Sequence, residues 1–147
     1  MASFLLSSEW VFMGRKILAV DDDPDQLKVV CSCLKEAGFA ISTATNGFDA
    51  LKKARAISPD LIVLDVMIPQ LDGFAVCATL REDDATAATP ILLVTGLSSN
   101  ISRLTGVEAG ATDYIVKPFN PEELVSKVEA LLCSPSAAPE SEKTALR

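Results

Sequence analysis

The sequence predicts an α/β domain built from five β-α units, (βα)5, and folded as a doubly wound parallel sheet. Short continuous apolar runs, typical of strands buried on both faces, alternate with helix-length segments that carry start and stop signals. The 147 residues are 49% hydrophobic and 22% charged, which is ordinary usage for one folded domain. Alternating strands and helices favour a parallel sheet covered on both faces.

The strands are marked by apolar runs such as ILAV, LIVL and ILLV, and we expect them near residues 16–20, 39–44, 60–64, 90–94 and 112–116. The intervening helices are expected near residues 24–37, 46–57, 71–82, 99–109 and 121–132. Each predicted strand is thus followed by a helix.

Two helix starts carry clear capping signals. Asp23 precedes Pro24 and Asn120 precedes Pro121, so both are expected as N-caps with proline in the first turn. Asp23 also thickens an acidic run that could bind metal, but capping explains it without any ion. Gly38 is expected to end the first helix.

Polarity predicts the strand order 2-1-3-4-5. The first, third and fourth strands are unbroken apolar runs, which suit the centre of a sheet. The second contains Ser42 and Thr43, which suit an edge. In this order the first and third strands are neighbours, and the chain changes direction between them. A crevice is therefore expected beyond their carboxyl ends, where such sheets bind ligands.

Polar side chains stand at four of the five strand ends. Asp21 and Asp22 follow the first strand, Asp65 the third, Thr95 the fourth and Lys117 the fifth. Carboxylates that converge at one edge repel one another unless a cation neutralises them. The chain contains no histidine, and an all-oxygen set of ligands favours a hard ion, so we expect Mg²⁺.

Asp65 is the candidate for covalent chemistry, because an aspartate carboxylate can accept a phosphoryl group. It ends a central strand, and Pro69 with the Asp72-Gly73 pair supplies turn chemistry in the loop that follows. The Lys117 ammonium and the Thr95 hydroxyl could stabilise phosphoryl oxygens.

The motifs ILAVDDDP, LIVLDVMIPQLDGF, LLVTG and YIVKPF resemble, in order and spacing, the receiver domains of two-component response regulators. The resemblance covers about residues 16–133, and the combination is highly specific although each motif alone is weak. It implies a flavodoxin-like receiver fold with Asp65 as the phosphoacceptor, and the length of the chain leads us to expect a stand-alone, single-domain response regulator.

The same resemblance implies the metal ligands. Asp22, Asp65 and the backbone carbonyl of Met67 would bind Mg²⁺, and Asp21 would act through a metal-bound water. Thr95 and Lys117 would contact the phosphoryl group, with Thr95 also a switch residue.

Other positions follow from the family pattern. Tyr114 matches the switch aromatic, and the bond between Lys117 and Pro118 is expected to be cis. Gly96 follows Thr95 where many relatives carry alanine, which loosens that loop and puts the amplitude of the signal in doubt.

The resemblance also implies partners. A sensor histidine kinase or a histidine phosphotransfer protein would donate the phosphoryl group, and a downstream effector protein would bind the face formed by the fourth helix, fifth strand and fifth helix. The chain would be a monomer or weak dimer, and no enzyme beyond its own phosphorylation and dephosphorylation.

The first helix is a further expected contact surface. Val29 and Cys33 are predicted as an apolar pair that either contacts a partner or is merely scattered surface. The buried stripe of the same helix is predicted to comprise Leu27, Val30, Cys31 and Leu34.

Composition excludes several other classes. The net charge of −7, without a basic cluster, argues against direct nucleic-acid binding. No apolar run reaches membrane-spanning length, residues 1–14 lack the basic start of a secretory signal, and we expect a cytoplasmic protein. The expected organisation is an N-terminal extension (1–14) that is poorly ordered, a receiver domain (15–133) and a disordered tail (134–147). The cysteines are expected to be reduced: Cys31, Cys33, Cys77 and Cys133.

Two alternatives stay open from the sequence. A haloacid-dehalogenase-like phosphatase would use Asp21 of the run Asp21-Asp22-Asp23 as its nucleophile. However, Asp25 replaces the usual threonine or valine, the chain has no room for a cap domain, and Asp65 would lack a purpose. A degenerate receiver that only binds proteins is the second alternative, and the complete acidic set argues against it.

Overall fold

The computed structural model describes residues 14–96 and 100–133. The expectations for residues 1–13 and 134–147 lie outside these described residues. The strands are β1 (Lys16–Val20), β2 (Ala40–Ala44), β3 (Leu61–Asp65), β4 (Ile91–Thr95) and β5 (Asp113–Val116). The helices are α2 (Pro24–Glu36), α3 (Gly47–Ile57), α4 (Gly73–Glu82), α5 (Asn100–Ala109) and α6 (Pro121–Cys133).

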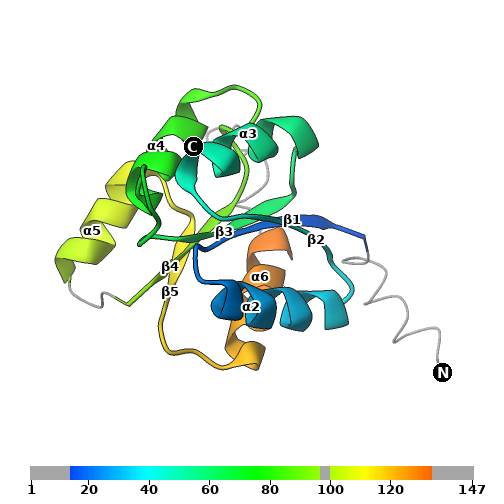
Figure 1. Ribbon diagram of the computed structural model, residues 1–147. Coiled ribbons are helices and arrows are strands. Elements are labelled where there is room, and N and C mark those ends of the chain that lie inside the picture. Colours follow the sequence, from blue (N-terminus) through cyan, green and yellow to red (C-terminus); the bar gives the residue numbers. More distant parts are fainter. Residues whose placement is uncertain (1–13, 97–99, 134–147) are drawn as a thin grey trace, which may run out of the picture.

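The sheet is parallel throughout and has the order β2-β1-β3-β4-β5, so the predicted fold class and strand order are confirmed. Figure 1 shows α2 and α6 on one face of the sheet, and α3, α4 and α5 on the other. This arrangement places the carboxyl ends of all five strands at one edge of the sheet.

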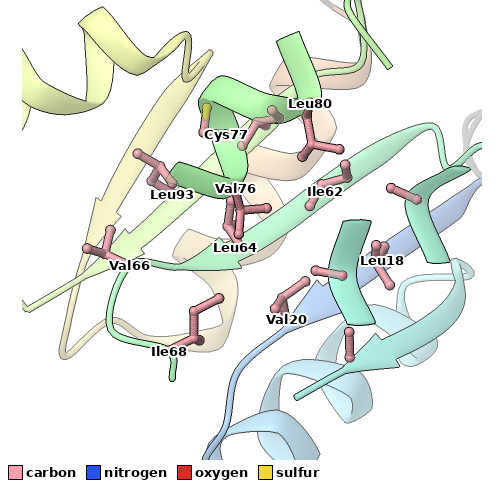
Figure 2. Packing of buried hydrophobic residues seen from close by; sticks show 14 residues of the cluster. Leu18, Val20, Ile62, Leu64, Val66, Ile68, Val76, Cys77, Leu80 and Leu93 are labelled. Carbon is pink, nitrogen blue, oxygen red and sulfur yellow. The ribbon is translucent and has the colours of Figure 1, made fainter. Parts of the chain in front are cut away.

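Alternation along the strands divides the core between the two faces. Leu18 and Leu64 point to the face covered by α3 and α4, where Leu18 lies beside α3 and Leu64 lies next to Val76 of α4 (Figure 2). Their strand neighbours point to the opposite face, where they pack against α2 and α6. Full burial of such side chains stabilises the fold by about 1.5–3 kcal/mol each, so the sheet is a rigid base for the residues at its edge.

Side-chain caps set where the helices begin. Asp23 accepts a hydrogen bond from the Asp25 amide at 3.0 Å, and Asn120 accepts one from the Glu123 amide at 2.7 Å. Both predicted caps are therefore confirmed. Asp72 accepts from the Ala75 amide at 2.9 Å, so α4 begins at Gly73 rather than at the predicted residue 71.

The predicted buried stripe of α2 is only partly buried. Val30 and Leu34 are in the core, Leu27 packs against it, and Cys31 is half-buried. Val29 is 52% exposed, whereas Cys33 lies in a groove between α2 and α6. Val29 is therefore the more exposed member of the predicted pair, and Cys33 is partly covered where α6 packs against α2.

All four cysteines lie within the described residues and are free thiols. No helix in the described part of the chain combines the length and the apolar character needed to cross a membrane.

Candidate functional site

The predicted site residues come together at the carboxyl edge of the sheet. Asp65 is the last residue of β3, and Thr95 is the last residue of β4. The sequence had placed each of them one residue beyond its strand. Asp21 directly follows β1, and Lys117 directly follows β5. Because the strands are parallel, these four side chains share one edge although they are far apart in the sequence.

Lys117 lies between two of the carboxylates. Its Nζ is 3.1 Å from Asp65 Oδ2 and 3.8 Å from Asp21 Oδ2. The other carboxylate oxygen of Asp65 accepts a hydrogen bond from the backbone amide of Met67 at 3.1 Å. Asp21 accepts one from the Asp23 amide at 3.0 Å. The Asp65 carboxylate is thus oriented by one contact from each side.

Gly73 holds the start of α4 against the end of β3. Its amide donates to the Val66 carbonyl oxygen at 2.9 Å, and a Cβ at this position would lie 2.6 Å from the Asp65 carbonyl oxygen. Only glycine permits this approach, so the Asp72-Gly73 pair is more than a turn signal. The close contact fixes the backbone that carries Asp65.

Asp21, Asp22 and Asp65 form a carboxylate cluster in which oxygens from the three residues all lie within 4.8 Å of one another. Asp21 and Asp65 are only 5% and 3% exposed, and Asp22 is exposed. Burial raises the pKa of Asp21 to about 6, with a smaller upward effect from the charge of Asp65, while the hydrogen bond from Asp23 opposes the rise.

Lys117 carries the compensating charge. Its partial burial alone would lower its pKa, but the hydrogen bond to Asp65 and the negative charges of Asp65 and Asp21 outweigh burial and raise it. The ammonium therefore stays protonated near neutral pH. One ammonium does not balance the carboxylate cluster, so the site keeps excess negative charge.

The residues present fit a divalent cation. Three carboxylates from two adjacent strand ends offer oxygen ligands, and the chain has no histidine to favour a softer metal. Mg²⁺ usually takes one or two carboxylates together with phosphate oxygens and waters. The excess negative charge and the exposure of Asp22 suit an ion that keeps part of its hydration shell.

The two expected switch residues lie on adjacent strands. Thr95 is 5% exposed, and its carbonyl oxygen accepts a hydrogen bond from the Lys117 amide at 2.8 Å. Tyr114 is half-buried on β5, and both side chains line a cavity of about 150 Å³ beneath α5. The peptide bond between Lys117 and Pro118 is cis in the structure.

Sequence reasoning missed two features around the site. It did not predict that Gly73 contacts the end of β3, and it gave Arg81 no role although five oxygen atoms surround its guanidinium. The Asp72-Gly73 motif was the available signal for the first. Nothing local in the sequence marks the second.

Comparison with known proteins gives a consistent result. Residues 17–129 match the family model described as the response regulator receiver domain. The alkaline phosphatase synthesis transcriptional regulatory protein PhoP of Bacillus subtilis (strain 168) is 44% identical over 131 residues, covering 88% of this chain and 54% of that protein. The chain thus spans about half the length of this curated relative.

Two solved structures are also similar. The chemotaxis response regulator CheY4 of Vibrio cholerae has 37% sequence identity and a TM-score of 0.77, covering 81% of this chain and 98% of that one. The receiver domain of sensor histidine kinase PA1611 from Pseudomonas aeruginosa PAO1 has 28% identity and a TM-score of 0.77, covering 82% and 99%. The latter has a magnesium ion coordinated in its active site cleft.

These matches decide between the receiver and the haloacid-dehalogenase-like alternative. The family model spans most of the chain and contains every strand end that contributes to the site, including Asp65, for which the alternative has no purpose. The chain therefore belongs to the response regulator receiver family of two-component systems.

Proposed function

We propose that this receiver accepts a phosphoryl group from a phosphohistidine partner on Asp65, in a Mg²⁺-dependent reaction. The observation that carries the proposal is the position of Lys117 Nζ, 3.1 Å from Asp65 Oδ2 and beside the carboxylate cluster. A buried carboxylate with an ammonium on one oxygen and an excess of acidic neighbours is suited to receive a phosphoryl group together with a cation.

In the proposed transfer, an Asp65 carboxylate oxygen bonds to phosphorus while the phosphorus–nitrogen bond of the donor phosphohistidine breaks. The histidine nitrogen keeps the electron pair of that bond. Such transfers pass through a loose transition state, so the protein acts mainly by alignment and by neutralising charge. The Met67 amide orients Asp65, while the Lys117 ammonium and the Thr95 hydroxyl would bind phosphoryl oxygens.

Mg²⁺ would supply further positive charge on the phosphoryl oxygens when it is bound. Asp22, Asp65 and the Met67 backbone carbonyl are its proposed ligands, with Asp21 acting through a water. The exposed side chain of Asp22 is accessible to a hydrated ion.

Phosphorylation is proposed to act on the surface formed by α5, β5 and α6. The added charge at Asp65 would draw Thr95 towards it, and Tyr114 would turn inward. The cavity that both side chains line supports this, because it offers the tyrosine ring a place to move into. A downstream effector protein would recognise the changed surface. Direct nucleic-acid contact is not proposed, because the chain carries a net charge of −7.

Acetyl phosphate with Mg²⁺, followed by intact mass measurement, tests the acceptor. We expect a phosphoryl adduct that is lost in Asp65→Asn and kept in Asp84→Asn, an exposed control. An adduct lost in Asp21→Asn but kept in Asp65→Asn would contradict the assignment of Asp65. If the unmodified chain gives no adduct, the chain is a degenerate receiver that only binds proteins.

Val29 is the proposed contact on α2 for the phosphohistidine partner. It is 52% exposed on α2, the helix that directly follows the acidic run Asp21-Asp22-Asp23. Val29→Lys is expected to slow phosphotransfer from a cognate kinase without affecting the acetyl phosphate reaction. Leu104→Lys, on α5 and 61% exposed, is the matched control. An unchanged transfer rate in Val29→Lys would contradict the contact.

A further inference from the structure

A cavity of about 150 Å³ lies beneath α5, on the face of the sheet that α4 and α5 cover. Figure 2 shows two of its lining residues, Val66, which directly follows β3, and Leu93, in the middle of β4. Most of its lining is apolar or aromatic, and the main contributors among the described residues are Val66, Phe74, Leu93, Gly106, Val107 and Tyr114.

Gly106 forms part of the cavity wall from within α5. Glycine is a poor helix former, so its place inside this helix calls for a packing reason. A Cβ at this position would lie 3.1 Å from Leu93 Cδ1 and 3.7 Å from Phe74 Cε1. Any larger side chain would press on Leu93 and occupy space at the wall. The glycine therefore helps to keep the cavity open.

The size and lining of the cavity define what it can hold. A largely apolar cavity of about 150 Å³ is large enough for one benzene-sized ring. Phe74 and Tyr114 offer aromatic contacts, and Thr95 contributes a polar group at the carboxyl edge of the sheet. The lining also includes Asp113, but most of its surface is apolar, so a neutral ring gains more contacts there than a hydrated ion does.

We propose that this cavity is a binding site for one uncharged aromatic ring, with phenol as the simplest ligand. The Tyr114 side chain is itself a phenol at the cavity wall, so free phenol and the inward-turned Tyr114 would compete for the same space. The binding site stands without any phosphorylation, and only the competition rests on the proposed function.

Tyr114 is the chain's only tyrosine, so labelling with fluorotyrosine gives a single ¹⁹F resonance at the cavity wall. Titration with phenol, without any phosphoryl group, is expected to shift this resonance to saturation. Gly106→Ala should raise the dissociation constant of phenol about tenfold, because the new methyl overpacks the wall. This variant should fold, since alanine favours a helix.

Gly96→Ala is the matched control, because its Cβ would meet nothing within 4 Å and Gly96 does not line the cavity. Phenol should bind this variant as it binds the unmodified chain. Equal weakening in both variants, or a resonance that does not respond to phenol in the unmodified chain, would overturn the binding site.

Beryllofluoride with Mg²⁺, a mimic of the phosphoryl group, tests the competition. The affinity for phenol is expected to fall when the mimic is bound. If the chain forms an adduct with acetyl phosphate, yet beryllofluoride leaves phenol binding unchanged, the competition is wrong. If no adduct forms at all, the proposed phosphorylation fails, but the phenol titration alone still decides whether the cavity binds a ring.

Discussion

Two polar clusters lie at opposite ends of the sheet and differ in how fully their polar groups are paired. At the carboxyl end, the carboxylate cluster of Asp21, Asp22 and Asp65 has Lys117 as the cation beside it. At the amino end, the guanidinium of Arg81 donates 2.6–3.3 Å hydrogen bonds to the Gly110, Thr86, Ala87 and Thr89 carbonyl oxygens and to Thr112 Oγ1.

This difference distinguishes the Arg81 cluster, which stabilises the fold, from the carboxylate cluster, which is the candidate functional site. Each nitrogen of the Arg81 guanidinium donates to neutral oxygens, so the cluster joins the end of α4 to the segments before β4 and β5 and needs no ligand. The carboxylate cluster keeps more negative charge than Lys117 can balance, and two of its members are buried. The cluster therefore favours binding of a cation, together with an anionic group whose charge the cation can neutralise.

The largest expected effect is on the reaction at the carboxyl end. Lys117→Met should slow the acetyl phosphate reaction about 100-fold, because it removes the charged donor 3.1 Å from Asp65 Oδ2. The rate is measured as adduct accumulation by intact mass. Lys127→Met, which removes a lysine paired with Asp113 at 3.3 Å, is the control and should leave the rate unchanged. Equal rates in both variants would refute the role of Lys117.

At the amino end the expected effect is on stability alone. Arg81→Met should lower the free energy of unfolding by about 3 kcal/mol, because carbonyl oxygens of the loop before β4 lose their donor. Urea denaturation measures the change. Arg55→Met is the matched control: Arg55 is 72% exposed in its ion pair with Asp83, so little change is expected. A stable Arg81→Met variant would show that the cluster is dispensable.

The third prediction concerns pH. In the folded chain the pKa of Asp21 is about 6, above its ordinary value of 3.8, so the folded state binds this proton more tightly than the unfolded state. The contribution of Asp21 to stability is therefore lost as pH rises from about 4 to about 6. Without Mg²⁺, the unmodified chain should lose roughly 2–3 kcal/mol relative to Asp21→Asn across that range.

Urea denaturation at a series of pH values, with a chelator present, measures this difference. Parallel stability curves for the unmodified chain and for Asp21→Asn would contradict the raised pKa. The direction matters, because a carboxylate stabilised by Lys117 alone would give the opposite slope.

The smallest expected effect is stabilisation by the ion. At about ten times its dissociation constant, Mg²⁺ should raise the free energy of unfolding by about 1.4 kcal/mol, because it binds only the folded cluster. Asp22→Asn should weaken this response, whereas Arg55→Met should keep it. A thermal unfolding midpoint that does not change with added Mg²⁺ would argue against the metal site.

Much of this fold could be predicted from the sequence, because its signals are local. Apolar runs identified the strands, and Asp23 and Asn120 marked two helix starts. The errors were at the boundaries. The Asp72 cap moved the start of α4, and Asp65 and Thr95 belong to their strands rather than to the loops that follow. Whether the last residue of a strand still pairs with the neighbouring strand cannot be predicted from the residue types.

By itself, the sequence determined which chemical groups stand at the carboxyl edge, since parallel strands bring their ends together whatever the details of packing. Only the tertiary structure decided which groups touch. Lys117 meets Asp65 across 52 positions and Arg81 meets Gly110 across 29, while Gly106 borders a cavity. Such contacts depend on how helices pack against the sheet, and side chains so distant in sequence leave no local pattern from which their distance could be predicted.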